Sequence, residues 1–133
     1  MITISLCMIV KNEEQTLGRC LDCVRDIADE IIIVDTGSAD RTKEIAAIYT
    51  DKIYDFPWID DFSAARNFSF SKASMDYILW LDADDVLLPE DIVKFQQLKA
   101  ALPPGTDAIM MRYNTGFDEQ GRVTFSCYRE RLV

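Results

Sequence analysis

The segment EIIIVDTGSAD, residues 30–40, joins a buried strand directly to a helix. Its four consecutive β-branched residues, Ile31–Val34, predict the strand, and Gly37 predicts the turn that follows. Ser38 or Asp40 can cap the next helix. The apolar face of that helix is predicted to comprise Ile45, Ile48 and Tyr49. A strand that passes through a short turn into a helix is typical of α/β folds.

The same order of strand followed by helix recurs along the chain. Further strands are predicted at residues 3–10, 52–56 and 77–81, and further helices at residues 13–28, 61–73 and from Pro89 to the PPG at 103–105. This alternation predicts an α/β fold with a mostly parallel sheet and helices on both faces. Residues 107–115 and 123–133 then flank a turn at DEQG, which predicts a C-terminal hairpin or a pair of edge strands.

The composition predicts a single soluble domain. The 133 residues suffice for one core, and 49% hydrophobic with 28% charged residues argues against disorder. Asp and Glu number 23 against 14 Lys and Arg, and the resulting formal charge of −9 disfavours nucleic acid as a partner. No apolar run approaches the roughly 18 residues of a membrane span, so we predict no transmembrane segment and a cytoplasmic protein. Histidine is absent, which rules out His-based triads within these residues.

The four cysteines are predicted to pack rather than react. Cys20 and Cys23 form a C-x-x-C pair, but they fall on the apolar face of a predicted helix, where cysteine serves as a small apolar residue. A zinc site would need a second such pair or histidines, and Cys7 and Cys127 do not supply one. Core packing is therefore favoured over redox or zinc chemistry.

Polar side chains follow each predicted strand. They are Lys11, Asn12 and Glu13 after the first strand, Asp35 and Ser38 after the second, Asp55 after the third, and Asp82 and Asp84 after the fourth. Ligands of open α/β sheets bind outside the carboxyl ends of the strands. We therefore expect these groups to converge if the strands are parallel neighbours.

Asp82 and Asp84 form the densest acidic group, in the segment LWLDADDVLLP. If the backbone stays extended there, both side chains project to one side. Two carboxylates about 5 Å apart repel by roughly 3 kcal/mol at an effective dielectric of 20, so a half-buried pair favours a cation. Mg²⁺ or Mn²⁺ suits this pair, with phosphate oxygens and water filling the other positions. The alternative is a solvated acidic turn in which Asp85 caps the following helix.

Other polar groups have two interpretations each. Asp35 can accept hydrogen bonds from a base N–H or from ribose hydroxyls, or it can cap the turn at Gly37. Arg66, with Asn67 beside it, can pair with phosphate or form a surface ion pair. The aromatic residues of segment 58–70 are predicted to pack in the core rather than form a stacking platform for a base or sugar. They are Trp58, Phe62, Phe68 and Phe70.

Four segments taken together resemble family 2 glycosyltransferases, which have the GT-A nucleotide-sugar-binding fold. They are SLCMIVKNEE, DEIIIVDTGSADRT, FSAARNFSFSKA and YILWLDADDVLLPED, and they cover about residues 1–95 in the expected order. MIVKNEE and FSAARN are most similar to a bacterial subgroup often joined to helical repeats. The resemblance implies transfer of a sugar, with inversion, from a nucleoside diphosphate sugar, UDP-sugar favoured, to a saccharide, lipid or protein acceptor.

The resemblance also implies roles by position. Val10, Lys11, Asn12, Glu13 and Asp35 would hold the nucleoside, Arg66 would approach the uracil or phosphate, Asp82 would face the ribose or metal, and Asp84 would bind the metal. Ser38, Asn67 and Ala83 complete the predicted substrate-binding set. Many members have an aromatic residue for base stacking where this chain has Lys11.

The family's catalytic base, an acidic residue, is expected beyond Val133. The chain is therefore interpreted as one nucleotide-sugar-binding domain, residues 1–133, that stops short of that base. No residue within it is assigned as the base, because Asp118, Glu119 and Glu130 match no motif. A carboxylate base would deprotonate the acceptor hydroxyl.

Three other functions fit parts of the sequence. A phosphoacceptor receiver domain also uses Mg²⁺, but its acid pair belongs after the first strand, where this chain has KNEE. A nucleotidyltransferase would have a Gly-rich basic loop at that point. A non-catalytic binding domain with the same fold is the third. Walker A and dinucleotide-binding glycine motifs are both absent.

Overall fold

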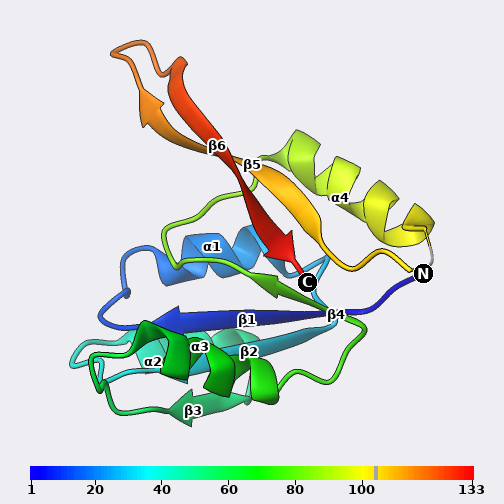
Figure 1. The fold of residues 1–133 in the computed structure, drawn as a ribbon. Coiled ribbons are helices and arrows are strands. Elements are labelled where there is room, and N and C mark those ends of the chain that lie inside the picture. The colour runs from blue at the N-terminus through cyan, green and yellow to red at the C-terminus, as the bar shows by residue number, and fades with distance from the viewer. Residues whose placement is uncertain (104) are drawn as a thin grey trace.

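The computed structural model describes residues 1–103 and 105–133, and for part of the C-terminal hairpin it describes the backbone alone. Strands and helices alternate up to the hairpin (Figure 1). In chain order the elements are β1 (Ile4–Val10), α1 (Leu17–Val24), β2 (Glu30–Asp35), α2 (Thr42–Tyr49), β3 (Ile53–Asp55), α3 (Phe62–Ser71), β4 (Tyr77–Trp80), α4 (Pro89–Ala101), β5 (Ile109–Phe117) and β6 (Val123–Leu132).

One six-stranded sheet runs in the order β3-β2-β1-β4-β6-β5. The four strands from β3 to β4 are parallel, and β6 pairs antiparallel with both β4 and β5. The predicted α/β fold with a mostly parallel sheet and a C-terminal hairpin is therefore confirmed. Asp35 lies opposite both Val10 and Asp55, so the carboxyl ends of three neighbouring strands meet at one edge of the sheet.

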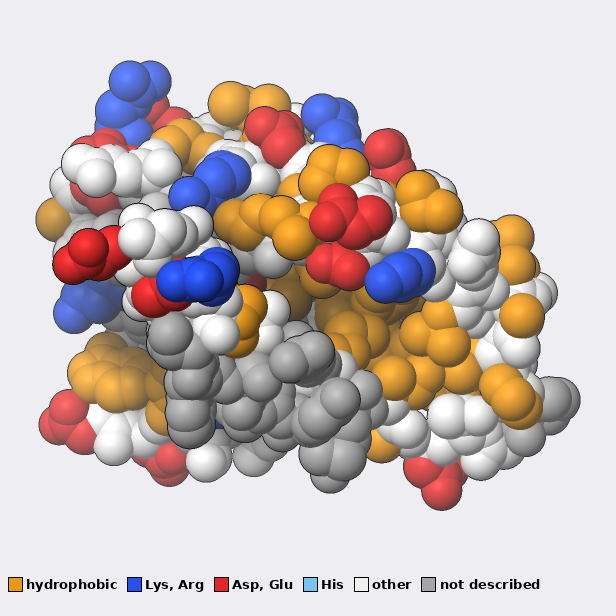
Figure 2. Space-filling model, turned by 90° about the horizontal axis from the view of Figure 1, so that it is seen from above, with side chains coloured by type: hydrophobic (Ala, Val, Ile, Leu, Met, Phe, Trp, Pro, Cys, Tyr) orange, Lys and Arg blue, Asp and Glu red, His pale blue; other side chains and the backbone are white. Residues whose placement is uncertain are grey.

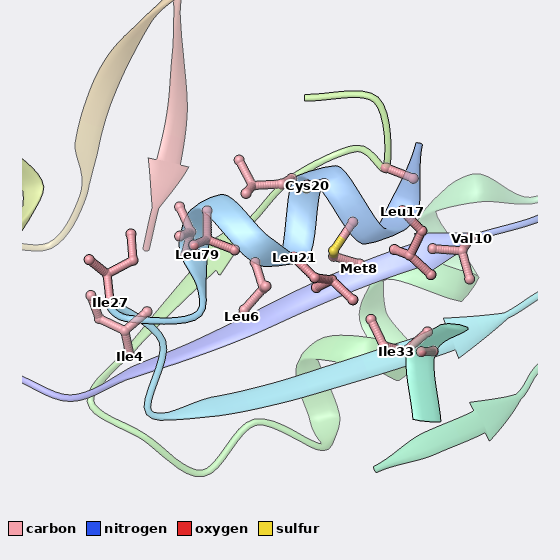
Figure 3. Packing of buried hydrophobic residues seen from close by; sticks show 14 of the residues in the cluster. Ile4, Leu6, Met8, Val10, Leu17, Cys20, Leu21, Ile27, Ile33 and Leu79 are labelled. Atoms are coloured by element: carbon pink, nitrogen blue, oxygen red, sulfur yellow. The ribbon is translucent and has the colours of Figure 1, made fainter. Parts of the chain in front are cut away.

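Alternate residues of β1 face opposite sides of the sheet. Leu6, Met8 and Val10 point toward Leu17 and Leu21 of α1, and all five belong to the larger core cluster (Figure 3). Residues of α2 and α4 join this cluster. On the other face a smaller cluster packs against aromatic residues of β3 and α3. Its members are Cys7, Ile32 and Val34, with Tyr54, Phe56, Phe68, Phe70, Ala73 and Ile78 packed against them. Helices cover both faces, as predicted.

Two helices differ in detail from their prediction. Residues 13–16 form a turn before α1, because Leu17 N and Thr16 N both donate to the Glu13 carbonyl oxygen. On α2, Ile48 is 74% exposed and Ala46 is buried in its place, so the inward orientation predicted for Ile48 is wrong. Asp40 does support the start of α2, since its Oδ1 accepts a hydrogen bond from Thr42 N at 3.0 Å.

The cysteines pack as expected where the structure describes them. Cys7 and Cys20 are buried, Cys23 is half-buried, and all three are free thiols. Burial raises the pKa of Cys7 and of Cys20 to about 12, which keeps both thiols protonated. The side chain of Cys127 lies outside the described residues. Within those residues, no helix combines the length and apolarity needed to cross a membrane.

Candidate functional site

A cleft of about 460 Å³ opens at the carboxyl ends of β1, β2 and β4. Six of the predicted site residues line it: Val10, Lys11, Glu13, Asp82, Ala83 and Asp84. The remaining lining residues are Ile9, Thr36, Trp58 and Phe62. The parallel order of the strands thus brings together groups that lie more than seventy positions apart in the sequence.

The acidic residues after β4 are gathered by a turn. Asp82 N donates to Asp85 Oδ2 at 2.9 Å, and Asp85 N donates to the Asp82 carbonyl oxygen at 2.9 Å. One carboxylate oxygen from each of Asp82, Asp84 and Asp85 lies within 4.8 Å of the others. The acids converge as predicted. The prediction that an extended backbone aligns them is wrong, because β4 ends at Trp80. Asp85 does not cap α4, whose N-cap is Leu88.

The donor set of this turn fits a hard divalent cation. All three candidate ligands are carboxylates, the ligand type that Mg²⁺ and Mn²⁺ prefer. Within the described part of the chain, the carboxylates of Asp82 and Asp84 make no hydrogen bond or ion pair. Burial raises the pKa of Asp82, and the negative charges of Asp85 and Asp84 add to this, while Arg131 and Arg66 oppose it. The turn therefore holds negative charge that a cation would stabilise.

Only one of the two carboxylate oxygens of Asp35 accepts hydrogen bonds among the described residues. Asp35 is 2% exposed, and its Oδ1 accepts hydrogen bonds from Gly37 N and Ser38 N, both at 2.8 Å. Its Oδ2 is buried and has no hydrogen-bond partner among the described residues. The turn-capping interpretation is therefore confirmed for Oδ1, while Oδ2 is a buried acceptor without a partner among the described residues, and Asp35 does not line the cleft.

Asn12 and Ser38 join the two loops behind the cleft. Asn12 has a φ of 53°, its N donates to Ser38 Oγ at 2.9 Å, and its Oδ1 accepts from Ala39 N at 2.7 Å. Glu13 N donates to Thr42 Oγ1 at 2.8 Å. These bonds fix the loop after β1 to the loop after β2. Direct contact of Asn12 or Ser38 with substrate stays a prediction.

Arg66 stacks on aromatic rings beside the cleft. Its guanidinium carbon lies 4.3 Å from the ring centre of Trp80 and 5.0 Å from that of Phe62. Burial lowers its pKa, while Asp82 opposes the shift. No ion pair involves Arg66 in the part of the chain that the structure describes, so the surface ion pair is not what holds it. Neither Arg66 nor the neighbouring, exposed Asn67 is part of the cleft lining.

Sequence reasoning misplaced two aromatic residues and missed one arginine. Trp58 and Phe62 are 42% and 49% exposed and line the cleft, so their predicted core packing is wrong. Phe68 and Phe70 do pack in the core. Arg131, near the end of β6, forms an ion pair with Asp85 at 3.0 Å. The segment CYRERLV around it carries no motif that would have identified this role.

A second hollow, of about 620 Å³, lies between the acidic turn, the start of α4 and the hairpin. Most of its lining is apolar, including Leu81, Val86, Leu87, Leu88 and Met111. It shares Asp84 with the first cleft. From above, hydrophobic side chains gather in a depression bordered by acidic and basic side chains (Figure 2).

One family profile covers nearly the whole chain. The family profile described as Glycosyl transferase family 2 matches residues 5–131. A TPR repeat-containing protein of Synechococcus elongatus is 51% identical over 90 residues, which cover 68% of this chain and 22% of that protein. The SPbeta prophage-derived glycosyltransferase SunS of Bacillus subtilis is 33% identical over 108 residues, covering 75% of this chain and 24% of that protein. This chain thus spans about a quarter of the length of these relatives.

Solved structures show the same fold. Glucosyl-3-phosphoglycerate synthase of Mycobacterium tuberculosis, in complex with Mn²⁺ and UDP-glucose, matches with a TM-score of 0.55 and 25% identity. The match covers 64% of this chain and 34% of that one. Staphylococcus aureus TarS matches with a TM-score of 0.58 at 20% identity, over 73% of this chain and 32% of that one, which supports the fold alone.

Proposed function

Because this chain belongs to glycosyl transferase family 2, we propose that it binds a nucleoside diphosphate sugar, with a UDP-sugar favoured, through Mg²⁺ or Mn²⁺ at the acidic turn. The proposed reaction transfers the sugar to an acceptor with inversion. The mycobacterial synthase of the same fold binds Mn²⁺ together with UDP-glucose, which supports both the metal and the donor class. The expected helical-repeat subgroup is supported by the relative that contains TPR repeats.

The observation that carries the proposal is the convergence of Asp82, Asp84 and Asp85 within 4.8 Å at the edge of the cleft. A protein of formal charge −9 repels a diphosphate unless a cation reverses the sign locally. When bound, a divalent ion supplies that charge and stabilises the diphosphate as the sugar departs. Asp84 is the principal proposed ligand, with Asp82 as the second ligand or as the ribose contact.

The nucleoside is proposed to bind at the tips of β1 and β2. The unpartnered Asp35 Oδ2 would accept a hydrogen bond from a base N–H or a ribose hydroxyl, which would supply the partner that this buried oxygen lacks. Val10, Lys11 and Glu13 line the cleft. Trp58 offers an exposed aromatic face in the same cleft, so a stacking role replaces the core role expected for it.

Arg66 is proposed to meet the diphosphate. Its stacking on Trp80 and Phe62 fixes the guanidinium group without neutralising its charge. Asp82 attracts it from the cleft side. An oriented guanidinium can bind two phosphate oxygens at once.

The catalytic base stays unassigned. None of the described acids is linked to that role by its geometry, and the prediction that the base follows Val133 stays a prediction. The cytoplasmic location also stays a prediction. A receiver domain or a nucleotidyltransferase is not supported by the site, because Lys11, Asn12 and Glu13 follow β1 and the acids follow β4.

Calorimetry tests the proposal. UDP is titrated into the chain with Mn²⁺, with Mg²⁺ and with chelator, and the series is repeated on Asp84→Ala and on a control, Asp26→Ala, whose exposed carboxylate lies away from the cleft. We expect metal-dependent binding that Asp84→Ala weakens by at least about 100-fold, since even outer partners of metal ligands contribute 10- to 100-fold. The control should bind as the wild type does. Equal UDP affinity in chelator and in Mn²⁺ would remove the metal from the proposal.

A further inference from the structure

We propose that Arg131 is a positioning residue that holds the acidic turn in the shape in which Asp82 and Asp84 share a divalent cation. The inference rests on the proposed function, because it concerns the same metal site. Arg131 lines the second hollow and not the cleft, and we place its role in its contacts with the acidic turn. Its position on β6, about fifty residues after the turn, separates it from every segment used to recognise the site.

Arg131 is held by two parts of the turn segment. Its side chain is 4% exposed. Its Nη1 donates to Asp85 Oδ2 at 3.0 Å and to the Trp80 carbonyl oxygen at 3.2 Å. Its guanidinium carbon lies 4.1 Å from the centre of the Trp80 ring. A buried guanidinium with these contacts fixes the end of β4 and the end of the turn relative to each other.

Asp85 passes this constraint to Asp82. The same Oδ2 that accepts from Arg131 also accepts from Asp82 N at 2.9 Å. Asp85 N closes the turn by donating to the Asp82 carbonyl oxygen. Asp85 is therefore proposed to shape the turn, while the unpaired carboxylates of Asp82 and Asp84 face the cation. Without Arg131, the Asp85 carboxylate would lose the ion pair that it makes among the described residues.

Helix α1 supports the same turn differently. Arg19 Nη2 donates to the Asp84 carbonyl oxygen at 3.3 Å, and Cys20 Sγ donates to the Asp82 carbonyl oxygen at 3.6 Å. Both contacts hold backbone oxygens. Among the described residues, the side chain of Asp85 is oriented by Arg131 and by Asp82 N. The orientation of that carboxylate is thus the feature that Arg131 controls.

The test measures metal affinity and folding in parallel. Mn²⁺ binding by electron paramagnetic resonance, the ratio of UDP affinity in Mn²⁺ to that in chelator, and the urea midpoint are recorded for Arg131→Met, Arg131→Lys and the double variant Arg131→Met/Asp85→Asn. Arg122→Met is the control, since Arg122 also pairs with an aspartate, Asp118 at 2.7 Å, but in the exposed turn of the hairpin.

We expect Arg131→Met to weaken Mn²⁺ binding by about 10- to 100-fold, the range found when outer partners of metal ligands are removed. Arg131→Lys should restore part of this affinity, because it returns the charge without the two-point contact. The double variant should recover the urea midpoint, because no unpaired buried charge remains, and still bind Mn²⁺ weakly. Arg122→Met should leave both quantities unchanged.

The outcomes separate this inference from the proposed function. If the wild type binds no Mn²⁺, the proposed metal site itself fails. A second outcome is that the wild type binds Mn²⁺ while the Arg131→Lys and double variants fold and bind Mn²⁺ as tightly as the wild type does. In that case the metal site stands and the positioning role is overturned. Recovery of both Mn²⁺ affinity and urea midpoint in the double variant would also overturn that role, since Arg131 would then serve folding alone.

Discussion

Both ends of the parallel sheet carry acids, but at the carboxyl ends paired carboxylates, such as that of Asp85 with Arg131, lie beside carboxylates that are unpaired among the described residues. At the amino ends, Glu30 accepts hydrogen bonds from Ser5, Ser74 and Lys52, and Asp29 accepts from Lys99 and from Ile4 N. At the carboxyl ends, Asp82, Asp84 and Asp35 Oδ2 lack such partners within the described residues. Acidic side chains thus stabilise the fold at one end of the sheet and leave negative charge for a ligand at the other.

The largest effect is expected from breaking a pair at the amino end. Lys99, on α4, has an 11% exposed side chain and donates to Asp29 at 2.6 Å and to the Ile27 carbonyl oxygen at 3.1 Å. Lys99→Met keeps the apolar stem but leaves Asp29 without its cation. Because about a third of the Asp29 side chain is exposed, we expect the free energy of unfolding, measured in urea, to fall by about 2–3 kcal/mol.

The matched control for Lys99→Met is Lys43→Met. Lys43 pairs with Asp55 at 2.7 Å, but both side chains are largely exposed. Such pairs contribute about 0–1 kcal/mol. A loss from Lys99→Met no larger than this would mean that the amino-end pairs do not stabilise the fold.

Glu30→Gln is expected to have the next largest effect. The Glu30 side chain is 2% exposed, and the variant keeps its size while removing the negative charge that pairs with Lys52 and accepts a hydrogen bond from Ser74. Because half of the Lys52 side chain is exposed, we expect a loss of about 2 kcal/mol in the urea-derived free energy of unfolding. An unchanged value would show that the hydrogen bonds matter and the charge does not.

The free energy of unfolding should also fall in acid, because Glu30 becomes protonated. Burial alone would raise the pKa of Glu30, but hydrogen bonds from Lys52, Ser74 and Ser5 outweigh it and lower the pKa to about 2. A lowered pKa contributes stability that is complete above the ordinary value of 4.5 and is lost as the pH falls toward 2. Urea unfolding at pH 6, 4 and 3 should show this loss, and Glu30→Gln should show less of it than the wild type.

Much of the fold could be predicted because periodicity reports burial. The β-branched run Ile31–Val34 became β2, and Pro89 marked the start of α4. The error at Ile48 has a local cause. Residues 42–49 hold apolar residues on more than one face, and the small Ala46 packs against the sheet while Ile48 faces solvent. Sequence periodicity does not reveal which of two apolar stripes has a partner.

The site could be predicted only where its residues follow their own strands. Asp35, Asp82 and Asp84 end buried runs, so strand order alone brought them to one edge. Arg131 could not be found this way, because its partner Asp85 lies in a turn that it meets only when β6 pairs with β4. Trp58 and Phe62 were misplaced because aromatic character indicates burial equally well in a core and in a cleft wall.

The smallest predicted effect is a gain in the free energy of unfolding rather than a loss. Asp84→Asn removes an exposed carboxylate from a group whose like charges repel, and no hydrogen bond or ion pair within the described residues is lost with it. We therefore expect the metal-free free energy of unfolding to rise by about 0.5–1 kcal/mol, since repulsion near water is weak. At 100 times the dissociation constant, UDP with Mn²⁺ should stabilise the wild type by about 2.7 kcal/mol and the variant much less, which reverses their order. Urea unfolding in chelator and in Mn²⁺ with UDP measures both. If Asp84→Asn were destabilising in chelator, its carboxylate would belong with the paired acids at the other end of the sheet, and the contrast between the two ends would not hold.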